Sequence, residues 1–169
     1  MPNNITHKLV IPKSMSEEVL SVIAPDGQVS FATLIPEPPH LYHGNLNAED
    51  ERDFPINWNS WNCENWGTKW DAYHTEISHH DDKVEIRFQT AWSVPHPFMA
   101  ALSNRWPDME FDHRYFDEMG NYWGRELWRK CPFSDGRVVR TEKHYSRPED
   151  RQALQLELLG YEDEPTTEE

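Results

Sequence analysis

Several kinds of residue and motif are scarce in this 169-residue chain, and each absence excludes a class of protein. Only two cysteines are present, Cys63 and Cys131, which are too few for a four-thiolate iron–sulfur cluster and are not spaced like zinc ligands. The seven glycines are scattered and form neither a phosphate-binding loop nor a dinucleotide-binding motif. The sequence therefore contains no pattern that supports an enzyme, catalytic residues, a cofactor or a bound metal.

Long apolar runs are also missing. No stretch approaches the roughly 20 apolar residues that a membrane-spanning helix needs. The first residues, Met1 to His7, lack the basic and apolar segments of a secretory signal. We therefore predict a soluble cytoplasmic protein that does not bind membranes and whose two thiols are reduced.

Acidic and aromatic residues are, by contrast, abundant. Thirty acidic residues against 16 basic ones give a formal net charge of −14, which repels nucleic acid and attracts basic proteins, or simply keeps the protein soluble. Eight Trp, seven Phe and six Tyr supply apolar area for a core, although the mean hydropathy is −0.88. We predict one folded domain, residues 1–160, followed by a disordered acidic tail, residues 161–169.

The hydrophobic periodicity predicts alternating strands and helices. Their order predicts an α+β fold of the ferredoxin-like (split βαβ) type, with a mixed or antiparallel sheet, helices packed on one face, and insertions. The predicted strands are residues 7–11, 29–35, 70–77, 84–92, 108–112 and 122–128, the predicted helices are 16–23, 57–66, 95–106 and 147–159, and residues 36–56 are predicted to be a long surface loop.

Two motifs resemble a known family. Residues 65–73 read Asn-Trp-Gly-Thr-Lys-Trp-Asp-Ala-Tyr, and residues 88–95 read Phe-Gln-Thr-Ala-Trp-Ser-Val-Pro. Together with Pro107 to Phe111, they resemble the ferredoxin-like domain family typified by the plasmid protein YubB. This resemblance extends over about residues 1–130. It implies a ferredoxin-like topology without a cluster and an origin on phages or plasmids, and it brings no reaction or catalytic residue.

The two tryptophans of the first motif, Trp66 and Trp70, are open to two interpretations. As exposed rings they would contact a partner, because Trp is enriched at binding hot spots and stacks well on bases. As buried rings they would belong to the core, with Gly67 supplying the turn between a helix and a strand. We expect both rings to be core residues, because large aromatic side chains dominate core packing.

A row of carboxylates is the candidate partner-binding surface. Asp108, Glu110 and Asp112 alternate along a predicted strand, at a spacing of about 7 Å, and Glu118 lies beyond them. Such a row can imitate nucleic-acid phosphates, or it can be an ordinary solvated strand face. We hypothesise a non-enzymatic phage or plasmid accessory protein that uses these residues to bind and inhibit a basic, nucleic-acid-handling host protein. It would act as an anti-defence or anti-CRISPR inhibitor through DNA mimicry.

Two further hypotheses stay open. Half of the basic residues lie between residues 123 and 151 and alternate with aromatic residues, a pattern typical of a small RNA- or nucleotide-binding domain, although these bases can equally pair with the acidic surface. The His-His-Asp-Asp turn at residues 79–82 offers ligands for a metal-dependent hydrolase, but neighbouring turn residues rarely converge on one ion. The basic residues of the 123–151 stretch are Arg125, Arg129, Lys130, Arg137, Arg140, Lys143, Arg147 and Arg151.

Overall fold

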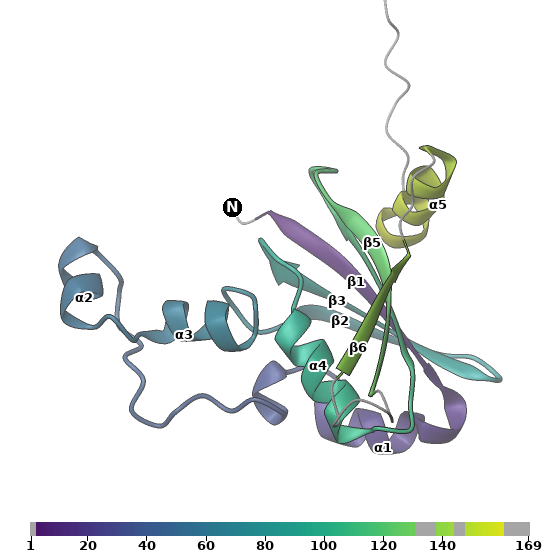
Figure 1. The fold of residues 1–169 in the computed structure, drawn as a ribbon, viewed down its shortest axis with the longest axis horizontal. Helices are drawn as coiled ribbons and strands as arrows, with labels where there is room; N and C mark the ends of the chain where they lie inside the picture. The colour runs from purple at the N-terminus through teal and green to yellow at the C-terminus, as the bar shows by residue number, and fades with distance from the viewer. Residues whose placement is uncertain (1–2, 131–137, 144–147, 161–169) are drawn as a thin grey trace, which may run out of the picture.

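The computed structural model describes residues 3–130, 138–143 and 148–160, so that the predicted acidic tail and Cys131 lie outside the described residues. The described strands form a six-stranded sheet in the order β2-β3-β1-β4-β5-β6, and all neighbouring strands are antiparallel (Figure 1). The strands are β1 Asn4–Pro12, β2 Tyr73–His79, β3 Lys83–Ala91, β4 Phe111–Asp117, β5 Trp123–Lys130 and β6 Val138–Lys143.

The first four strands and two of the helices reproduce the predicted ferredoxin-like arrangement. Along the chain they follow the order β1-α1-β2-β3-α4-β4, and β1 lies between β3 and β4 in the sheet. Strands β5 and β6 then extend the sheet beyond β4. The helices are α1 Lys13–Ile23, α2 Ala48–Asp53, α3 Trp58–Asn65, α4 His96–Arg105 and α5 Pro148–Leu159, with a single 3-10 turn, η1, at Phe31–Thr33.

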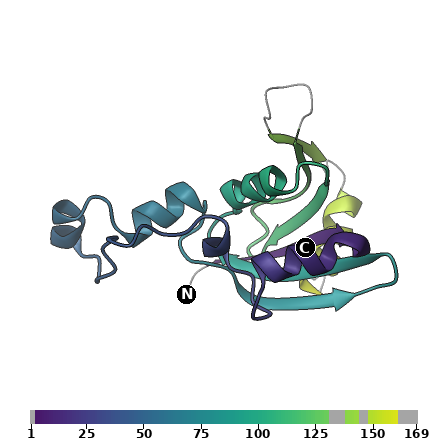
Figure 2. The same cartoon turned by 90° about the horizontal axis from the view of Figure 1, so that it is seen from below.

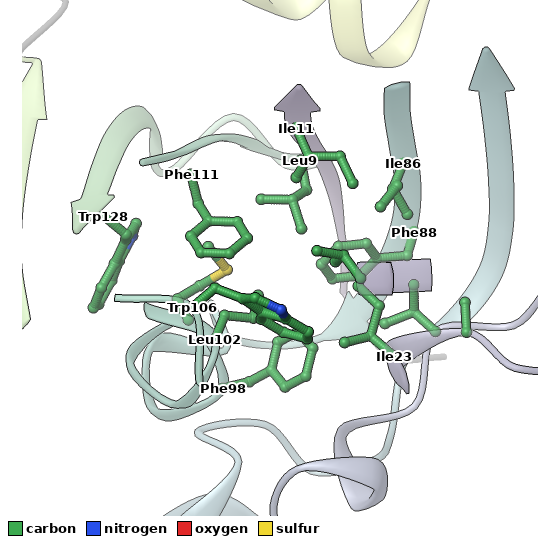
Figure 3. Packing of buried hydrophobic residues seen from close by; sticks show 14 of the residues in the cluster. Leu9, Ile11, Ile23, Ile86, Phe88, Phe98, Leu102, Trp106, Phe111 and Trp128 are labelled. Atoms are coloured by element: carbon green, nitrogen blue, oxygen red, sulfur yellow. The ribbon is translucent and has the colours of Figure 1, made fainter. Parts of the chain in front are cut away.

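The main core lies between the sheet and the pair of helices α1 and α4 (Figure 3). Alternate residues of β3, among them Ile86 and Phe88, are fully buried, as the period of two in the sequence predicts. Phe98 and Leu102 of α4 are fully buried against the same face. Because burial of one such side chain stabilises the fold by about 2 kcal/mol, this cluster fixes the register of the central strands.

The opposite face of the sheet is covered by α5 (Figure 1). Leu154 and Leu158 of α5 pack against Phe116 of β4. Two ion pairs hold the helix down, because the carboxylate of Glu157 lies 2.7 Å from the ammonium of Lys8 and 2.6 Å from a guanidinium nitrogen of Arg114. Helices α1 and α4 share one face, as predicted, whereas α5 makes a third layer on the other face.

Residues 29–35, predicted as a strand, do not join the sheet. Two of their backbone donors are satisfied by side chains: Phe31 N donates to a carboxylate oxygen of Asp71 at 2.6 Å, and Val29 N donates to Thr75 Oγ1 at 2.9 Å. Ser30 N, Leu34 N and Ile35 N donate to backbone carbonyls outside the sheet. The strand prediction was wrong because the apolar side chains of this segment are buried in the core although its backbone does not join the sheet. Val29 and Phe31 are buried in the core from a loop and the 3-10 turn.

Several predicted boundaries also shift. Strand β4 begins at Phe111, because Met109 N donates to Trp106 O at 3.1 Å and closes a turn after α4. The strand predicted at residues 108–112 therefore starts later, and it continues to Asp117. Helix α1 begins at Lys13, three residues before the predicted cap. Strand β2 begins at Tyr73 rather than at residue 70 and contains a bulge before Glu76.

Residues 36–65 form an arm that projects from the sheet, with α2 near its tip (Figures 1 and 2). The predicted helix at 57–66 is confirmed as α3, and the predicted loop at 36–56 contains the short helix α2. Asn47 caps α2, since its side-chain oxygen accepts hydrogen bonds from Glu49 N and Asp50 N at 2.9 Å. None of the residues of α2, all of them described, is buried.

Candidate functional site

The four predicted contact residues do not form a row. Asp108 and Glu110 are exposed but precede β4, and Glu118 lies at the far end of that strand, where its carboxylate accepts from Asn4 N at 2.7 Å. Asp112 is half-buried and accepts two hydrogen bonds from the Arg125 guanidinium, at 2.7 and 2.6 Å.

The electrostatics of Asp112 also differ from those of a phosphate mimic. Burial alone would raise the pKa of Asp112, but the guanidinium groups of Arg125 and Arg114 outweigh burial and lower that pKa. The carboxylate is therefore ionised and already neutralised by two cations. Asp108 and Glu110 remain available as exposed charges, and the contact role of all four residues stays a prediction.

Trp66 and Trp70 occupy different environments. Trp66 is buried in the main core, and its indole N–H donates to Ile35 O at 2.8 Å. Trp70 is 39% exposed, with the ammonium of Lys69 at 5.0 Å from its ring centroid and 5.9 Å from that of Trp58. The expectation that both rings are core residues is therefore confirmed for Trp66 and wrong for Trp70, whose ring lies at the surface beside Lys69.

Two bases of the 123–151 stretch have partners within the chain. Arg125 pairs with Asp112, and the guanidinium of Arg151 lies 5.0 Å from the ring centroid of Trp123. Side chains of residues 131–147 lie outside the description, so the nucleotide-binding hypothesis stays a prediction.

In the His-His-Asp-Asp turn, His79 Nδ1 lies 3.1 Å from Lys13 Nζ. Among the described residues, no three His, Cys, Asp or Glu side chains are grouped to hold a metal ion.

A buried polar network that the sequence analysis missed crosses the core face of the sheet. Thr90 Oγ1 donates to Ser93 O at 2.7 Å, so its oxygen accepts from the Nε2–H of His7 at 2.8 Å. His7 Nδ1 is then an acceptor, and His113 Nε2–H donates to it at 3.0 Å. The remaining nitrogen, His113 Nδ1, faces Glu126 Oε2 at 3.5 Å. These contacts fix the neutral tautomers of both histidines.

Glu126 connects this network to the surface. Its carboxylate, only 1% exposed, accepts from Trp128 Nε1 at 2.9 Å and from Nε2 of His96, whose side chain is 40% exposed, at 3.0 Å. Burial opposes ionisation of Glu126, but the neighbouring imidazoles of His113 and His96 outweigh burial and hold its pKa well below the ordinary value. The carboxylate is therefore charged inside the fold.

The two buried histidines are held neutral mainly by burial. Burial lowers the pKa of His7 well below its ordinary value, and the neighbouring His113 lowers it further. Burial also lowers the pKa of His113, although Glu126 opposes the shift. A proton taken up at His113 Nδ1 would turn the 3.5 Å contact with Glu126 into a charge-assisted hydrogen bond. The sequence signal was the presence of His7, His113 and Glu126 at core-facing positions of three strands, which are the neighbours β1, β4 and β5.

The arm combines negative charge with exposed apolar groups. Phe54 is 44% exposed and Ile56 is 72% exposed, directly after the acidic helix α2. Phe54 stacks on Tyr42, with ring centroids 4.1 Å apart, so the ring is held in place although it is exposed. Residues 36–65 contain a single Arg, Arg52, and the acidic residues Glu37, Glu49, Asp50, Glu51, Asp53 and Glu64.

The sheet topology and the two motifs define a ferredoxin-like α+β domain that carries an inserted arm. The chain belongs to the family described as the ferredoxin-like domain in Api92-like protein, whose sequence profile matches residues 66–156. The match begins at Trp66, so the arm and strand β1 lie outside it. The ferredoxin-like class is confirmed, whereas the YubB name is not.

A solved structure is also similar to this chain. It is the crystal structure of a protein api92 from Yersinia pseudotuberculosis, with 15% sequence identity and a TM-score of 0.41. The similarity covers 54% of this chain and 32% of that chain, so this chain spans about a third of its length. No curated protein matches the chain. Within the described ranges, no helix is long and apolar enough to cross a membrane.

Proposed function

We propose that this protein is a non-enzymatic, cytoplasmic accessory protein of a phage or plasmid that binds a basic, nucleic-acid-handling host protein and inhibits it. The proposed origin on a mobile element rests on the sequence resemblance. The proposed inhibition of a basic protein rests on the net charge of −14. The arm is the binding surface in this proposal, and the exposed carboxylates of Asp108 and Glu110 add to the attraction of a basic partner.

The observation that carries the proposal is that α2 is ordered without a core. A six-residue helix is too short to be stable in water by itself, and no residue of α2 is buried against the rest of the chain. The capping box of Asn47 and Asp50 stabilises its first turn. A projecting helix with no buried residue is best explained as a surface for another molecule.

The chemistry of the arm selects a basic partner with some apolar surface. Four of the six residues of α2 are acidic and one is basic, and Phe54-Pro55-Ile56 follows with every residue exposed. A few residues, often aromatic, contribute most of the free energy at protein interfaces, while the surrounding charges set the association rate and the choice of partner. A surface that combines acidic groups with exposed apolar side chains fits a basic protein better than it fits a nucleic acid.

The test is capture of a partner by the tagged full chain from nuclease-treated host lysate, with salt raised stepwise. We expect a basic nucleic-acid-handling protein that is released by salt and is not captured by the double variant Phe54→Ser/Ile56→Ser. The matched control is Glu17→Lys/Asp26→Lys, which changes two exposed acids of the domain far from the arm in sequence.

Two results would overturn the proposal. One is capture of the same protein at unchanged yield by the Phe54→Ser/Ile56→Ser variant. The other is enrichment of RNA, and of no protein, when nuclease is omitted, which would favour the nucleotide-binding hypothesis for residues 123–151 instead.

A further inference from the structure

A groove of about 660 Å³ lies beside the C-terminal end of α5, on the face of the sheet that α5 covers. Its floor includes Thr6 of β1 and Gln89 of β3, and one wall is formed by Leu158 and Leu159 of α5. The bulged start of β2 contributes His74 to the opposite side. The groove is therefore enclosed by three strands and one helix end, and it is separate from the arm.

The backbone around this groove is distorted. His74 has a φ of +51°, a left-handed conformation that is uncommon for a non-glycine residue. The ring is held there because its Nδ1–H donates to Gln89 Oε1 at 2.8 Å, which leaves Nε2 as an acceptor in the neutral ring. Left-handed residues and bulges are concentrated at binding sites, where the distortion positions a side chain.

The charges that line the groove are unbalanced. Glu76 and Glu118 both line it, and among the described residues neither faces a cation within ion-pair distance. The two carboxylate oxygens of Glu118 accept hydrogen bonds from Asn4 N at 2.7 Å and Asn4 Nδ2 at 3.0 Å, which leave its negative charge in place. Arg87 also lines the groove, but its guanidinium donates to Glu157 O at 2.6 Å and to Leu158 O at 3.3 Å. The Arg87 guanidinium therefore binds the last carbonyl groups of α5, at the negative end of the helix dipole. The groove therefore offers the carboxylate of Glu76, the remaining acceptor capacity of the Glu118 carboxylate and an imidazole acceptor to a cationic ligand that donates hydrogen bonds.

We propose that this groove binds the cationic side chain of an arginine or lysine residue in a peptide. A guanidinium or ammonium group would meet Glu76 and Glu118, whereas the methylene stem would lie along Leu158 and Leu159. This inference deepens the proposed function, on which it rests for the basic nature of the partner, and it adds a second contact site on the domain itself.

The test is an NMR titration of the ¹⁵N-labelled full chain with the blocked tripeptide acetyl-Gly-Arg-Gly-amide. We expect saturable amide shifts at Thr75, Gln89 and Leu158. The same tripeptide with citrulline, which is neutral and similar in shape, should bind about tenfold more weakly, because a charge-assisted hydrogen bond is lost. Glu76→Gln should weaken the arginine peptide by a similar factor, and Glu17→Gln, a remote exposed acid, should leave it unchanged.

The failures of the two proposals are distinguishable. Equal binding of the arginine and citrulline peptides, or unchanged binding by Glu76→Gln, would overturn the groove as a cation site even if partner capture by the arm is intact. Loss of partner capture in the Phe54→Ser/Ile56→Ser variant with unchanged peptide binding would support both proposals. Saturable shifts confined to α2 would overturn the groove and place the basic side chain on the arm.

Discussion

The buried network of the sheet and the projecting arm use polar side chains in opposite ways. In the network, His7 and His113 are fully buried, and their hydrogen bonds replace the water that the fold removes. In the arm, the cap of Asn47 holds a helix that has no buried residue. The same kinds of contact therefore determine stability in one region and only local order in the other. We therefore expect that stability and the proposed partner binding can be changed separately in this chain.

Removing the charge of Glu126 is expected to have the largest effect on the free energy of unfolding. Glu126→Gln keeps the shape but replaces a carboxylate oxygen by an N–H donor among side chains that donate to it. Because the charge is buried and paired, the change should destabilise the fold by about 3 kcal/mol, read as a lower urea midpoint. Glu110→Gln, an exposed control, should change the free energy by less than about 0.5 kcal/mol. Equal midpoints for the two variants would show that the network carries no stability.

The pH dependence of stability is the second expected effect. The folded-state pKa of His7 and of His113 is lowered, so the unfolded chain binds more protons than the folded chain as the pH falls below about 6.5. Stability should therefore decrease from pH 7 to pH 5, by up to about 1.4 kcal/mol per pH unit for each histidine. The lowered pKa of Glu126 adds to this loss only below its ordinary value near 4.5.

Urea titrations at pH 7, 6 and 5 measure this slope. An arm variant such as Glu51→Gln should show the same slope as the parent protein, because it leaves both histidines untouched. A flat profile between pH 7 and pH 5 would contradict the assignment of two buried neutral histidines.

Deleting the cap of α2 should have a smaller and local effect. Asn47→Ala removes the acceptor for Glu49 N and Asp50 N, which is worth about 1 kcal/mol to the helix. Amide exchange within α2 should accelerate about fivefold, while exchange in β1 and the urea midpoint stay unchanged. A lower midpoint would mean that the arm is coupled to the core, and the contrast between the two regions would fail.

The smallest effect on stability is expected at Ile56, and it is also the sharpest test of the arm. This side chain is 72% exposed, so Ile56→Ser should change the free energy of unfolding by less than about 0.5 kcal/mol. Thermal melting measures that change, and the capture assay measures binding. Normal melting with reduced capture would separate the two regions, whereas reduced melting with normal capture would make Ile56 a structural residue.

The sequence predicted the parts of this fold that follow local periodicity. The alternation of Ile86 and Phe88 with polar residues identified β3, and the ferredoxin-like order followed from the sequence of strands and helices. Residues 29–35 were wrongly predicted as a strand. Their β-favouring residues lie in a loop and a 3-10 turn, where backbone N–H groups donate to the side chains of Asp71 and Thr75. Such bonds join positions about 40 residues apart, and no local pattern reports them.

The candidate sites show the same limit. Asp112 was predicted as a carboxylate that contacts a partner, whereas its pairing with Arg125 depends on the register of β4 with β5, which the sequence does not show. The same registers of β1, β4 and β5 bring His7, His113 and Glu126 together, and each of the three alone resembles an ordinary polar residue in a strand. The acidic character of the arm was visible in the composition, whereas its projection from the domain depends on the three-dimensional structure.

The central position of β1 has a consequence for how the chain folds during synthesis. Strand β1 is synthesised before both of its neighbours, because it pairs with residues 83–91 on one side and with residues 112–117 on the other. At 5–20 residues per second, the ribosome takes roughly 5–20 s to make the intervening chain. Throughout that time Ile5, Leu9 and Ile11 have neither neighbouring strand, and Lys8 in their midst serves as a gatekeeper against aggregation. We therefore expect the charge that later docks α5 through Glu157 to oppose aggregation of the nascent chain first.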